Sequence, residues 1–501
     1  MIDYVVNYYQ EIESLPVRPR VEPGYLRQRL TQAEFPLEGE KWSAIMADVE
    51  SHIMPGITHW QHPSFFAWYP GNSSPPAILG DLLANMFNVV GFSWEASPAA
   101  TELETIVLDQ LAHAMGLPEV FLSTGEGGGV IQGSASEGTL VGLLAARKRA
   151  LKHMRLDSPG TADHELLARM TLYASDQAHS SVQKAANIAG LGDNLRLIPT
   201  WASDDCHGHG PAEGEPYALD DTKLAAAMKE DIALGLTPMF VSANVGSTNT
   251  CAVDPVRAIG EACNSCAHGQ PGTNEKGTGL VPWLHVDAAY AGSAAICPEN
   301  RWILDGIEAA DSYLFNMHKW LLVNFDCTTM WVKRSAYLVD ALSVTPEILK
   351  SEEYRRGQVS DFRDWQVPLG RKFRSLKLWL TMRAYGLDKV RGLIRRHKVL
   401  AANFEALVLK DDRFEIVAPP RFGLVCFRLK SSDADNVELR QVTQPRSRII
   451  SSGLSFFSST KLGGRTCLRM CVGTPSTEAR HVRELWDAID RTATALAAEG
   501  G

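Results

Sequence analysis

Three features that mark common classes of protein are missing from this sequence. No uninterrupted apolar run reaches membrane-spanning length, and the nine cysteines, scattered over 501 residues, have no disulfide-framework spacing. Basic residues are not in excess, because 49 Lys and Arg stand against 58 Asp and Glu, for a net charge of −9. We therefore expect no membrane and no nucleic acid as partners.

Targeting signals are not evident either. The first residues, "MIDYVVNYYQEIES", are acidic where a secretory signal is basic, and the last ones, "ALAAEGG", carry no anchor motif. Nine cysteines without framework spacing suit a reducing compartment. The composition, 45% hydrophobic and 21% charged, is that of an ordinary globular protein. We expect a cytoplasmic protein.

Motifs for nucleotide binding and serine hydrolysis are absent from the glycine-rich stretch "GEGGGVIQGSASEG". It contains neither a complete G-x-G-x-x-G nor a Walker lysine, and neither Ser134 nor Ser136 stands in a G-x-S-x-G context. Ser134 and Glu137 instead have capping-box spacing ahead of a helical pattern. The N–H groups at such a helix start can hold an anion, although a capped helix with no ligand explains the same spacing.

The pattern along the chain predicts three parts. Residues 1–74 read as short helical pieces broken by prolines, which we interpret as an N-terminal helical arm or flap. In residues 75–390, runs of strand length alternate with helical patterns, which is typical of an α/β domain whose mostly parallel sheet is covered on both faces. Residues 391–501 fit a small C-terminal α+β domain.

Two charged residues stand at the ends of apolar runs. Asp287 ends the run in "PWLHVDAAY", where a carboxylate is costly to bury unless it meets a cation or several donors. Lys319, in "NMHKW", ends the next run, and apolar surroundings make an amine available to condense with an aldehyde. Taken singly, Asp287 could be a strand-end cap, Lys319 a solvated charge and His179, in "SDQAHSSVQKA", a structural histidine.

Pyridoxal 5'-phosphate explains the combination. It needs an anchored phosphate, a carboxylate that keeps the pyridine nitrogen protonated, and a lysine that binds the aldehyde as a Schiff base. The helix start near Ser134, together with Asp287 and Lys319, can supply all three.

With "HVDAAYAG", "NMHKW", "SDQAHSSVQKA" and "GGGVIQGSASE" in one chain, the sequence resembles the pyridoxal-phosphate-dependent aromatic L-amino-acid decarboxylases. This group II family includes dopa, tyrosine and tryptophan decarboxylases and plant aromatic aldehyde synthases. The similarity runs from "DYVVNYYQEIE" to "LRMCVGTPSTEARHV". It implies the fold-type I architecture of transferase-like enzymes, with a mostly parallel seven-stranded sheet, and a homodimer with active sites at its interface. The implied reaction passes through a quinonoid and releases CO2 and an aromatic amine from tyrosine, dopa, phenylalanine or tryptophan.

The resemblance also implies roles for individual residues. Lys319 would form the internal aldimine, Asp287 would pair with the pyridine nitrogen, and His179 and Ala289 would lie on opposite faces of the ring. The phosphate would be held by Ala135, Ser136 and Asn316, with Thr248 and His318 close to the cofactor. The substrate's ring would lie among Trp60, Trp68, Tyr69, Pro70, Val90 and Phe92, with Gly71 and Ala384 bearing on substrate choice.

Three positions depart from the family's pattern. Amine-forming members have Tyr where this chain has Phe362, in "SDFRDWQVPLG", and a phenol can protonate the substrate carbon whereas a phenyl ring cannot. Phe362 therefore leaves two outcomes open: an aldehyde synthase that consumes O2 and yields aldehyde, ammonia and peroxide, or an amine-forming enzyme in which His179 or water supplies the proton. Ala384 matches neither the Gly of indole-preferring members nor the Ser of phenol-preferring ones, and Gly71 replaces the Thr of animal dopa decarboxylases.

Two other classes of protein have some support in the sequence. Cys263 and Cys266, in "CNSC", could form half of a zinc site, and Cys206, His207 and His209 could complete it. Because no second C-x-x-C exists, we expect no metal. A catalytically inactive binding homologue is disfavoured because Lys319, Asp287 and His179 are all present.

Overall fold

The computed structural model describes residues 2–30, 34–201, 215–268, 279–344, 351–357, 359–430 and 453–499. The chain divides into two units by its internal contacts. The first contains Met1–Gly71, His397–Val417 and Gly423–Gly501, and the second contains Asn72–Arg396 and Ala418–Phe422. We call them the small and the large unit. The three-part division expected from the sequence stays a prediction.

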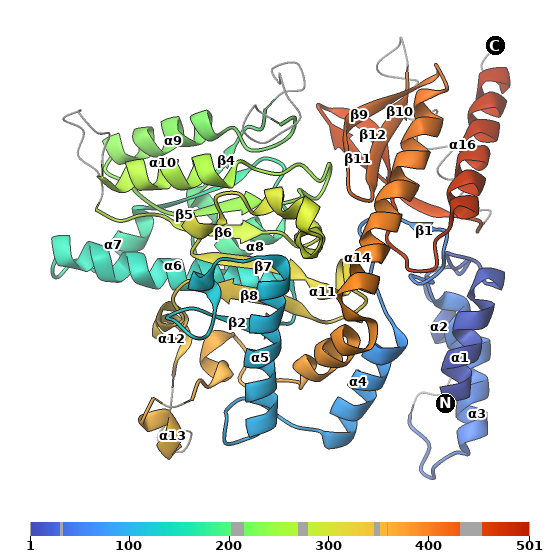
Figure 1. Cartoon of the computed structure of the whole chain (residues 1–501), viewed down its shortest axis with the longest axis horizontal. Helices are drawn as coiled ribbons and strands as arrows, with labels where there is room; N and C mark the ends of the chain where they lie inside the picture. The colour runs from blue at the N-terminus through green and yellow to red at the C-terminus, as the bar shows by residue number, and fades with distance from the viewer. Residues whose placement is uncertain are drawn as a thin grey trace. The chain divides into compact units, whose positions relative to one another are not determined.

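A seven-stranded sheet forms the centre of the large unit (Figure 1). Its strand order is β2-β8-β7-β6-β5-β3-β4, and the strands β3 to β7 all run parallel to their neighbours within that set. Only β8 is antiparallel, to β7 and to β2. The strands are β2 (Gly128–Gln132), β3 (Met170–Ser175), β4 (Leu195–Ile198), β5 (Thr237–Asn244), β6 (Trp283–Asp287), β7 (Ser312–Asn316) and β8 (Thr328–Val332). The expected mostly parallel seven-stranded sheet is confirmed.

Helices cover both faces of this sheet, as α9 and α10 do on one face and α6 on the other (Figure 1). Gly138 and Gly142 allow α6 to approach the sheet closely, because a Cβ at Gly138 would lie 2.8 Å from Leu314 Cδ2 and one at Gly142 3.3 Å from His285 Nδ1. The helices are α4 (Pro75–Phe87), α5 (Pro98–Met115), α6 (Ala135–Asp157), α7 (Asp163–Ala168), α8 (Ser181–Ile188), α9 (Asp221–Ala233), α10 (Val256–His268), α11 (Met317–Trp320), α12 (Ala336–Leu342) and α13 (Glu352–Arg355).

A five-stranded sheet forms the core of the small unit, in the order β1-β11-β12-β10-β9. Its strands are β1 (Phe65–Phe66), β9 (Phe414–Arg421), β10 (Leu424–Leu429), β11 (Phe456–Leu462) and β12 (Arg465–Cys471). The helices are α1 (Ile2–Glu11), α2 (Tyr25–Arg29), α3 (Trp42–Asp48) and α16 (Ala479–Glu499), and α14 (Arg374–Leu409), broken at Gly386, runs from the large unit's residues into those of the small unit. Aromatic residues of α14, α16 and this sheet, such as Phe404, Trp486 and Phe427, pack together in its core.

Among the residues that the structure describes, no helix is both long and apolar enough to cross a membrane.

Candidate active site

The carboxyl ends of the central strands bring the predicted cofactor residues to one edge of the large sheet. Asn244 at the end of β5 pairs in register with Asp287 at the end of β6. Asp287 in turn pairs with Leu314 of β7. Across the antiparallel strand β8, Thr328 lies opposite both Asn316 and Gln132, the last residues of β7 and β2. The residues that follow β2, β3, β5, β6 and β7 therefore emerge at this edge, which is where ligands bind in sheets of this kind.

The start of α6 provides an anion-binding group at that edge. Ser134 caps the helix, since its Oγ accepts the N–H of Glu137 at 3.1 Å, as the capping-box spacing predicted. The Glu137 carboxylate accepts the N–H of Gly133 at 2.9 Å, one residue before the cap. The first N–H groups of an α-helix, here those of Ala135 and Ser136, have no partner within the helix. Together with the positive end of a 23-residue helix, they suit a phosphate.

Thr328 of β8 connects Asn316 to the strand that precedes this helix, because it pairs with both Asn316 and Gln132. The Thr328 hydroxyl donates to Asn316 Oδ1 at 2.7 Å, which fixes the orientation of the Asn316 side chain. The N–H of Asn316 donates to the carbonyl of Ala289 at 3.0 Å, so the ends of β6 and β7 are tied together. The predicted phosphate residues thus come from the ends of β2 and β7, the two strands that flank β8.

Asp287, Lys319 and His179 form an interacting group. Asp287 is buried, and its Oδ1 accepts the N–H of Ala289 at 2.9 Å. Loss of surrounding water lowers the pKa of His179, the Asp287 carboxylate opposes that change, and the Lys319 ammonium adds to it. Because Asp287 and Lys319 both act on the titration of His179, the structure brings together the residues that the sequence could only place at separate strand ends.

The His179 ring is oriented by its own turn. The residue is exposed, follows β3, and accepts the N–H of Ser181 on Nδ1 at 3.1 Å. Since its pKa is lowered, the imidazole is neutral at pH 7, and an Nδ1 that accepts a hydrogen bond leaves the proton on Nε2. His179 can therefore donate a hydrogen bond from Nε2.

His318, next to Lys319, is a buried neutral histidine. Its Nδ1 accepts the N–H of Cys327 at 3.1 Å, and its carbonyl accepts the N–H of Asn72. Burial, with a smaller contribution from the Lys319 ammonium, lowers the pKa of His318 to about 4. His318 thus holds α11 in place rather than carrying a charge.

Burial of a histidine behind the site makes stability depend on pH. Burial lowers the pKa of His285, on β6, from 6.5 to about 4, while its Nδ1 lies 2.7 Å from Ser312 Oγ. The unfolded chain binds this proton below about pH 6.5 and the folded protein does not until about pH 4, so the free energy of unfolding should fall as the pH decreases between these values. Urea unfolding of His285→Asn over this range should give a shallower pH dependence than the wild type; parallel curves would contradict the assignment.

The aromatic residues predicted to hold the substrate form a cluster in the small unit. Trp60 stacks on Trp68 at 5.3 Å, and Trp68 meets Phe456 edge-on at 5.1 Å. Both tryptophans are partly exposed, whereas Tyr69 is buried beneath the guanidinium of Arg469, 5.3 Å from its ring. This cluster presents aromatic surface.

Pro70 and Gly71, which follow Tyr69 in the sequence, lie in closely packed positions. Pro70 lies on β12's end, since a Cβ at Gly473 would be 2.1 Å from Pro70 Cγ. A Cβ at Gly71 would lie 3.3 Å from Trp60 Cε3, so a larger residue there would press on the Trp60 ring.

Val90, Phe92 and Ala384 belong to the large unit. Val90 and Ala384 are exposed, and Phe92 is half-buried. The carbonyl of Phe92 accepts the N–H of Arg363 at 3.0 Å, so the segment around Phe92 is paired with the segment that contains Phe362.

Phe362 is a core residue in this structure. It is 3% exposed and packs with Trp365, edge-on at 5.4 Å, in the same hydrophobic cluster as Val130 of β2. The guanidinium of Arg371 lies 4.9 Å from its ring and pairs with the buried Glu104. The Phe362 ring is therefore enclosed by its own chain.

A buried carboxylate that the sequence did not single out shapes the turn that carries Thr248. Asp254 accepts the N–H of Asn244 at 2.6 Å and of Leu219 at 2.7 Å, and burial raises its pKa to about 6. The bond from Asn244 joins the end of β5 to the segment that follows it, where Thr248 lies half-buried, and the bond from Leu219 ties this segment to the residues before α9. Its only signal in the sequence was an acidic residue in an apolar stretch, "CAVDPV".

The structure describes two of the residues considered for zinc. Cys263 and Cys266 are buried on α10, and burial raises the pKa of the Cys263 thiol. No group of three or more candidate metal ligands occurs among the described residues, while Cys206, His207 and His209 lie outside them.

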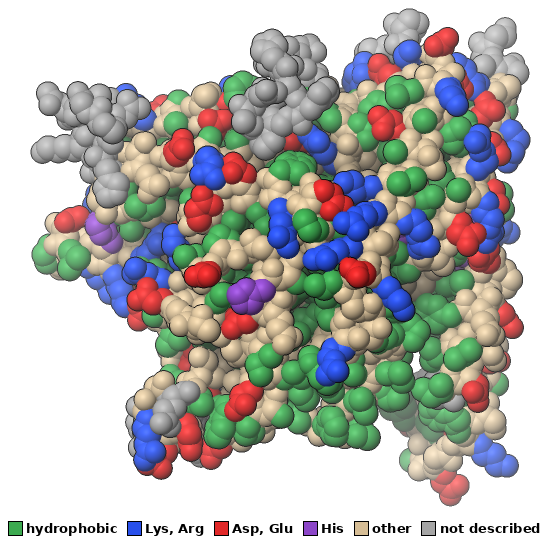
Figure 2. All heavy atoms as spheres, viewed as in Figure 1, with side chains coloured by type: hydrophobic (Ala, Val, Ile, Leu, Met, Phe, Trp, Pro, Cys, Tyr) green, Lys and Arg blue, Asp and Glu red, His purple; other side chains and the backbone are tan. Residues whose placement is uncertain are grey.

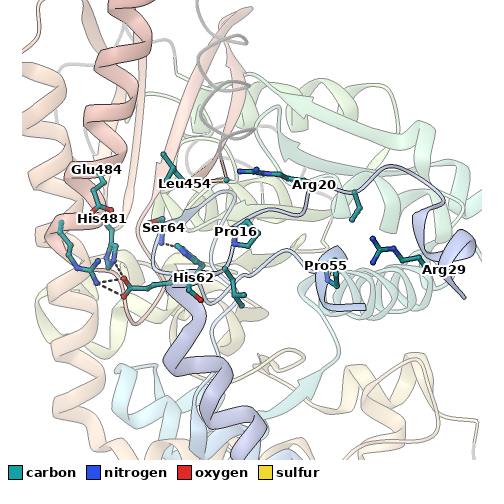
Figure 3. Close-up of a pocket in the computed structure, with 15 residues that line it drawn as sticks. Pro16, Arg20, Arg29, Pro55, His62, Ser64, Leu454, His481 and Glu484 are labelled. Carbon is teal, nitrogen blue, oxygen red and sulfur yellow. Dashed lines mark hydrogen bonds and ion pairs between the residues drawn. The ribbon is translucent and has the colours of Figure 1, made fainter. Parts of the chain in front are cut away.

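A hollow of about 680 Å³ lies within the small unit (Figure 3). It is lined by the N-terminal segment around Pro16 and by the start of α16, where Glu13 pairs with Arg480 at 2.8 Å and lies 3.5 Å from His481. Asp287, Lys319 and His179 belong to the large unit, and none of them lines this hollow.

Comparison with known proteins identifies the family. The model of the pyridoxal-dependent decarboxylase conserved domain matches residues 23–430. The chain belongs to this family. It is 46% identical to tryptophan decarboxylase 2 of Oryza sativa subsp. japonica, covering 99% of this chain and 93% of the relative, and 45% identical to the phenylacetaldehyde synthase of Arabidopsis thaliana, covering 99% and 95%. The crystal structure of Oryza sativa TDC with PLP and tryptamine superposes with a TM-score of 0.90 at 41% identity, covering 99% and 96%.

Pyridoxal phosphate is the cofactor of this enzyme, and the fold-type I architecture is confirmed. The residues present fit the cofactor. Its phosphate matches the free N–H groups at the start of α6, its pyridine nitrogen matches the buried Asp287 carboxylate, and its aldehyde requires an amine, which Lys319 has.

Proposed function

We propose that this enzyme decarboxylates an aromatic L-amino acid, of the tyrosine, dopa, phenylalanine and tryptophan class, and releases the aromatic amine. The observation that carries the proposal is the group of Asp287, Lys319 and His179 at the strand ends next to the start of α6. The names of its relatives, a tryptophan decarboxylase and aromatic-L-amino-acid decarboxylases, support the substrate class.

Bound pyridoxal phosphate supplies a protonated ring that accepts the electron pair left when CO2 departs from the α-carbon. Lys319 would hold the cofactor through its aldehyde carbon, and Asp287 would keep the pyridine nitrogen protonated. The N–H groups of Ala135 and Ser136, with the Asn316 side chain, would bind the phosphate, and Ala289 would pack against the ring. His179 would lie on the other face, and His179 or water would return a proton to the α-carbon.

Product analysis tests this proposal. The cofactor-loaded enzyme would be incubated in air with tyrosine, dopa, phenylalanine and tryptophan separately, and CO2, amine, aldehyde and peroxide would be measured in the same samples. We expect one amine per CO2 with at least one of the four. CO2 release from none of them would contradict the proposal.

A second candidate function is aromatic aldehyde synthesis, in which O2 intervenes before the proton returns. It is supported by the Arabidopsis relative's name. The sequence raises it because Phe362 stands where amine-forming members have a tyrosine. Aldehyde and peroxide equal to the CO2 would decide for this function.

Phe362→Tyr should leave the ratio of amine to aldehyde unchanged. Because the Phe362 ring is enclosed by Trp365 and Arg371, an added hydroxyl would be buried among them and would not reach a substrate. We expect lower stability, by roughly 1–3 kcal/mol, without a change of product. Product stoichiometry and urea unfolding of both proteins check this, and conversion of an aldehyde-forming wild type into an amine-forming variant would show instead that position 362 controls the proton.

We also propose that the enzyme is a homodimer with active sites at the interface. Helix α4 supports this, because five apolar side chains between 37% and 66% exposed follow its length at helical spacing: Leu79, Leu82, Leu83, Met86 and Phe87. Figure 2 shows the green side chains gathered over this region, below the centre of the view. An apolar surface of this kind is typical of a subunit interface.

Leu82→Glu with Met86→Glu should dissociate the dimer. Two carboxylates would have to be buried without partners in the interface, which disfavours association. Size-exclusion chromatography with light scattering should give about twice the 55.0 kDa chain mass for the wild type and one chain mass for the variant. Leu156→Glu, at an exposed position of α6, is the control and should stay dimeric. A monomeric wild type would contradict the proposal.

We place the enzyme in the cytoplasm. No disulfide joins the eight cysteines in the part of the chain that the structure describes, which suits a reducing compartment.

A further inference from the structure

The turn between β9 and β10 contains a phenylalanine in a conformation that phenylalanine rarely adopts. Phe422 has a φ of 52° and stands between Arg421, the last residue of β9, and Gly423, which precedes β10. Asn, Asp and Gly are the usual residues at left-handed positions of a two-residue turn, because a bulky side chain is strained there. Strain that is kept in a folded protein points to a use for the residue that causes it.

The Phe422 ring joins a line of aromatic residues in the large unit. It stacks on Trp302, with ring centroids 6.3 Å apart and planes 10° apart, and meets Trp320 edge-on at 6.2 Å. Trp320 is fully buried and stacks on Tyr290 at 4.8 Å, with planes 19° apart. We call Phe422, Trp302, Trp320 and Tyr290 the aromatic ladder.

Both inner members of the aromatic ladder adjoin cofactor residues. Trp320 directly follows Lys319 in α11, a helix of only four residues, which has little rigidity of its own. Tyr290 directly follows Ala289, whose N–H binds Asp287. The stacked pair Trp320 and Tyr290 therefore fixes the lysine's helix against the end of β6.

The outer end of the aromatic ladder is anchored by charge. Arg421 places its guanidinium 5.4 Å from the Trp302 ring, and its Nε donates to Glu215 Oε1 at 3.1 Å. Glu215 is only 2% exposed, so this pair is held in a fixed position. Arg421 thereby holds the turn on the N-terminal side of Phe422.

We propose that Phe422 is a positioning residue for Lys319, acting through Trp320. Its ring fills the space beside Trp320 and keeps α11 at the distance from Asp287 that the cofactor requires. This inference rests on the proposed function of Lys319 and adds to it a residue 103 positions away in the sequence.

Three variants of the full-length, cofactor-loaded enzyme test the proposal. Phe422→Gly removes the ring and also relieves the backbone strain, Phe422→Tyr keeps the ring, and Phe404→Leu perturbs an equally aromatic core position of the small unit. For each variant we would measure the pH titration of the visible absorbance of the lysine-bound cofactor, the thermal unfolding midpoint, kcat and KM.

We expect Phe422→Gly to shift the midpoint of the absorbance titration and to lower kcat about ten-fold, with KM changed less than about two-fold. Phe422→Tyr should behave as the wild type, and Phe404→Leu should lower the unfolding midpoint without moving the titration.

The proposal is overturned if Phe422→Gly keeps the wild-type titration and kcat, or if Phe404→Leu shifts the titration as much at an equal loss of stability. A wild-type enzyme that shows no lysine-bound cofactor would overturn the proposed function and this inference with it, whereas a normal wild type with unaffected variants overturns this inference alone.

Discussion

Lys319→Ala should abolish the visible absorbance of the lysine-bound cofactor and lower the rate of decarboxylation on the order of 10⁴-fold or more. An alanine has no amine to bond to the aldehyde of pyridoxal phosphate, and the other residues of the group cannot replace it. Asp287 is a carboxylate, and the neutral His179 is held on Nδ1 by the N–H of Ser181. Absorbance spectroscopy of the purified variant, followed by a CO2 assay, measures both effects.

A matched variant separates this loss from a general effect of removing a lysine. Lys184 is exposed on α8, five residues after His179, and Lys184→Ala should keep both the absorbance and the activity. A Lys319→Ala protein that retained the absorbance with its activity intact would refute the assignment of the cofactor lysine.

Asp287→Asn should lower kcat by about 10²- to 10³-fold while the protein still folds. The amide has nearly the shape of the carboxylate and can still accept the N–H of Ala289, but it carries no charge to keep the pyridine nitrogen protonated. Loss of that proton removes most of the ring's ability to accept electrons from the α-carbon. Steady-state kinetics with the best substrate, together with the absorbance of the bound cofactor, measure the change.

Asp311→Asn is the corresponding control. Asp311 precedes β7 at the opposite edge of the sheet, where it pairs with Arg149 at 2.9 Å and accepts the N–H of Leu284. Its loss should lower stability and leave kcat near the wild-type value. If both variants lost activity equally, the Asp287 carboxylate would be acting through the stability of the sheet and not on the cofactor.

The candidate cofactor residues Asp287 and Lys319 could be singled out in the sequence because each stands at the end of an apolar run. Asp287 and Lys319 break strongly hydrophobic stretches, and the Ser134 to Glu137 spacing predicted the cap that the structure shows. Such signals are local, so a single chain reveals them. The alternation of strand and helix likewise predicted the mostly parallel sheet, whose seven-stranded form is confirmed.

Other features of the site depend on contacts between distant segments, which the sequence does not encode in any local pattern. Nothing in "PPRFGL" indicates that Phe422 would stack on Trp302, more than 100 residues earlier. The pairing of Thr328 with both Gln132 and Asn316 depends on the register of the antiparallel strand β8, which only the folded sheet fixes. The enclosure of Phe362 by Trp365 and Arg371 is also a tertiary effect. Because of it, we interpret Phe362 as a core residue, whereas the sequence alone left open a role in the choice of product.

The most direct test of the account is to locate the cofactor on the chain. The cofactor-loaded enzyme would be reduced with borohydride, which makes the bond between lysine and pyridoxal phosphate permanent, and its peptides would be analysed by mass spectrometry. The account predicts that the pyridoxyl group is found on the peptide that contains Lys319. Modification of a different lysine, such as the buried Lys377, or of none, would contradict it.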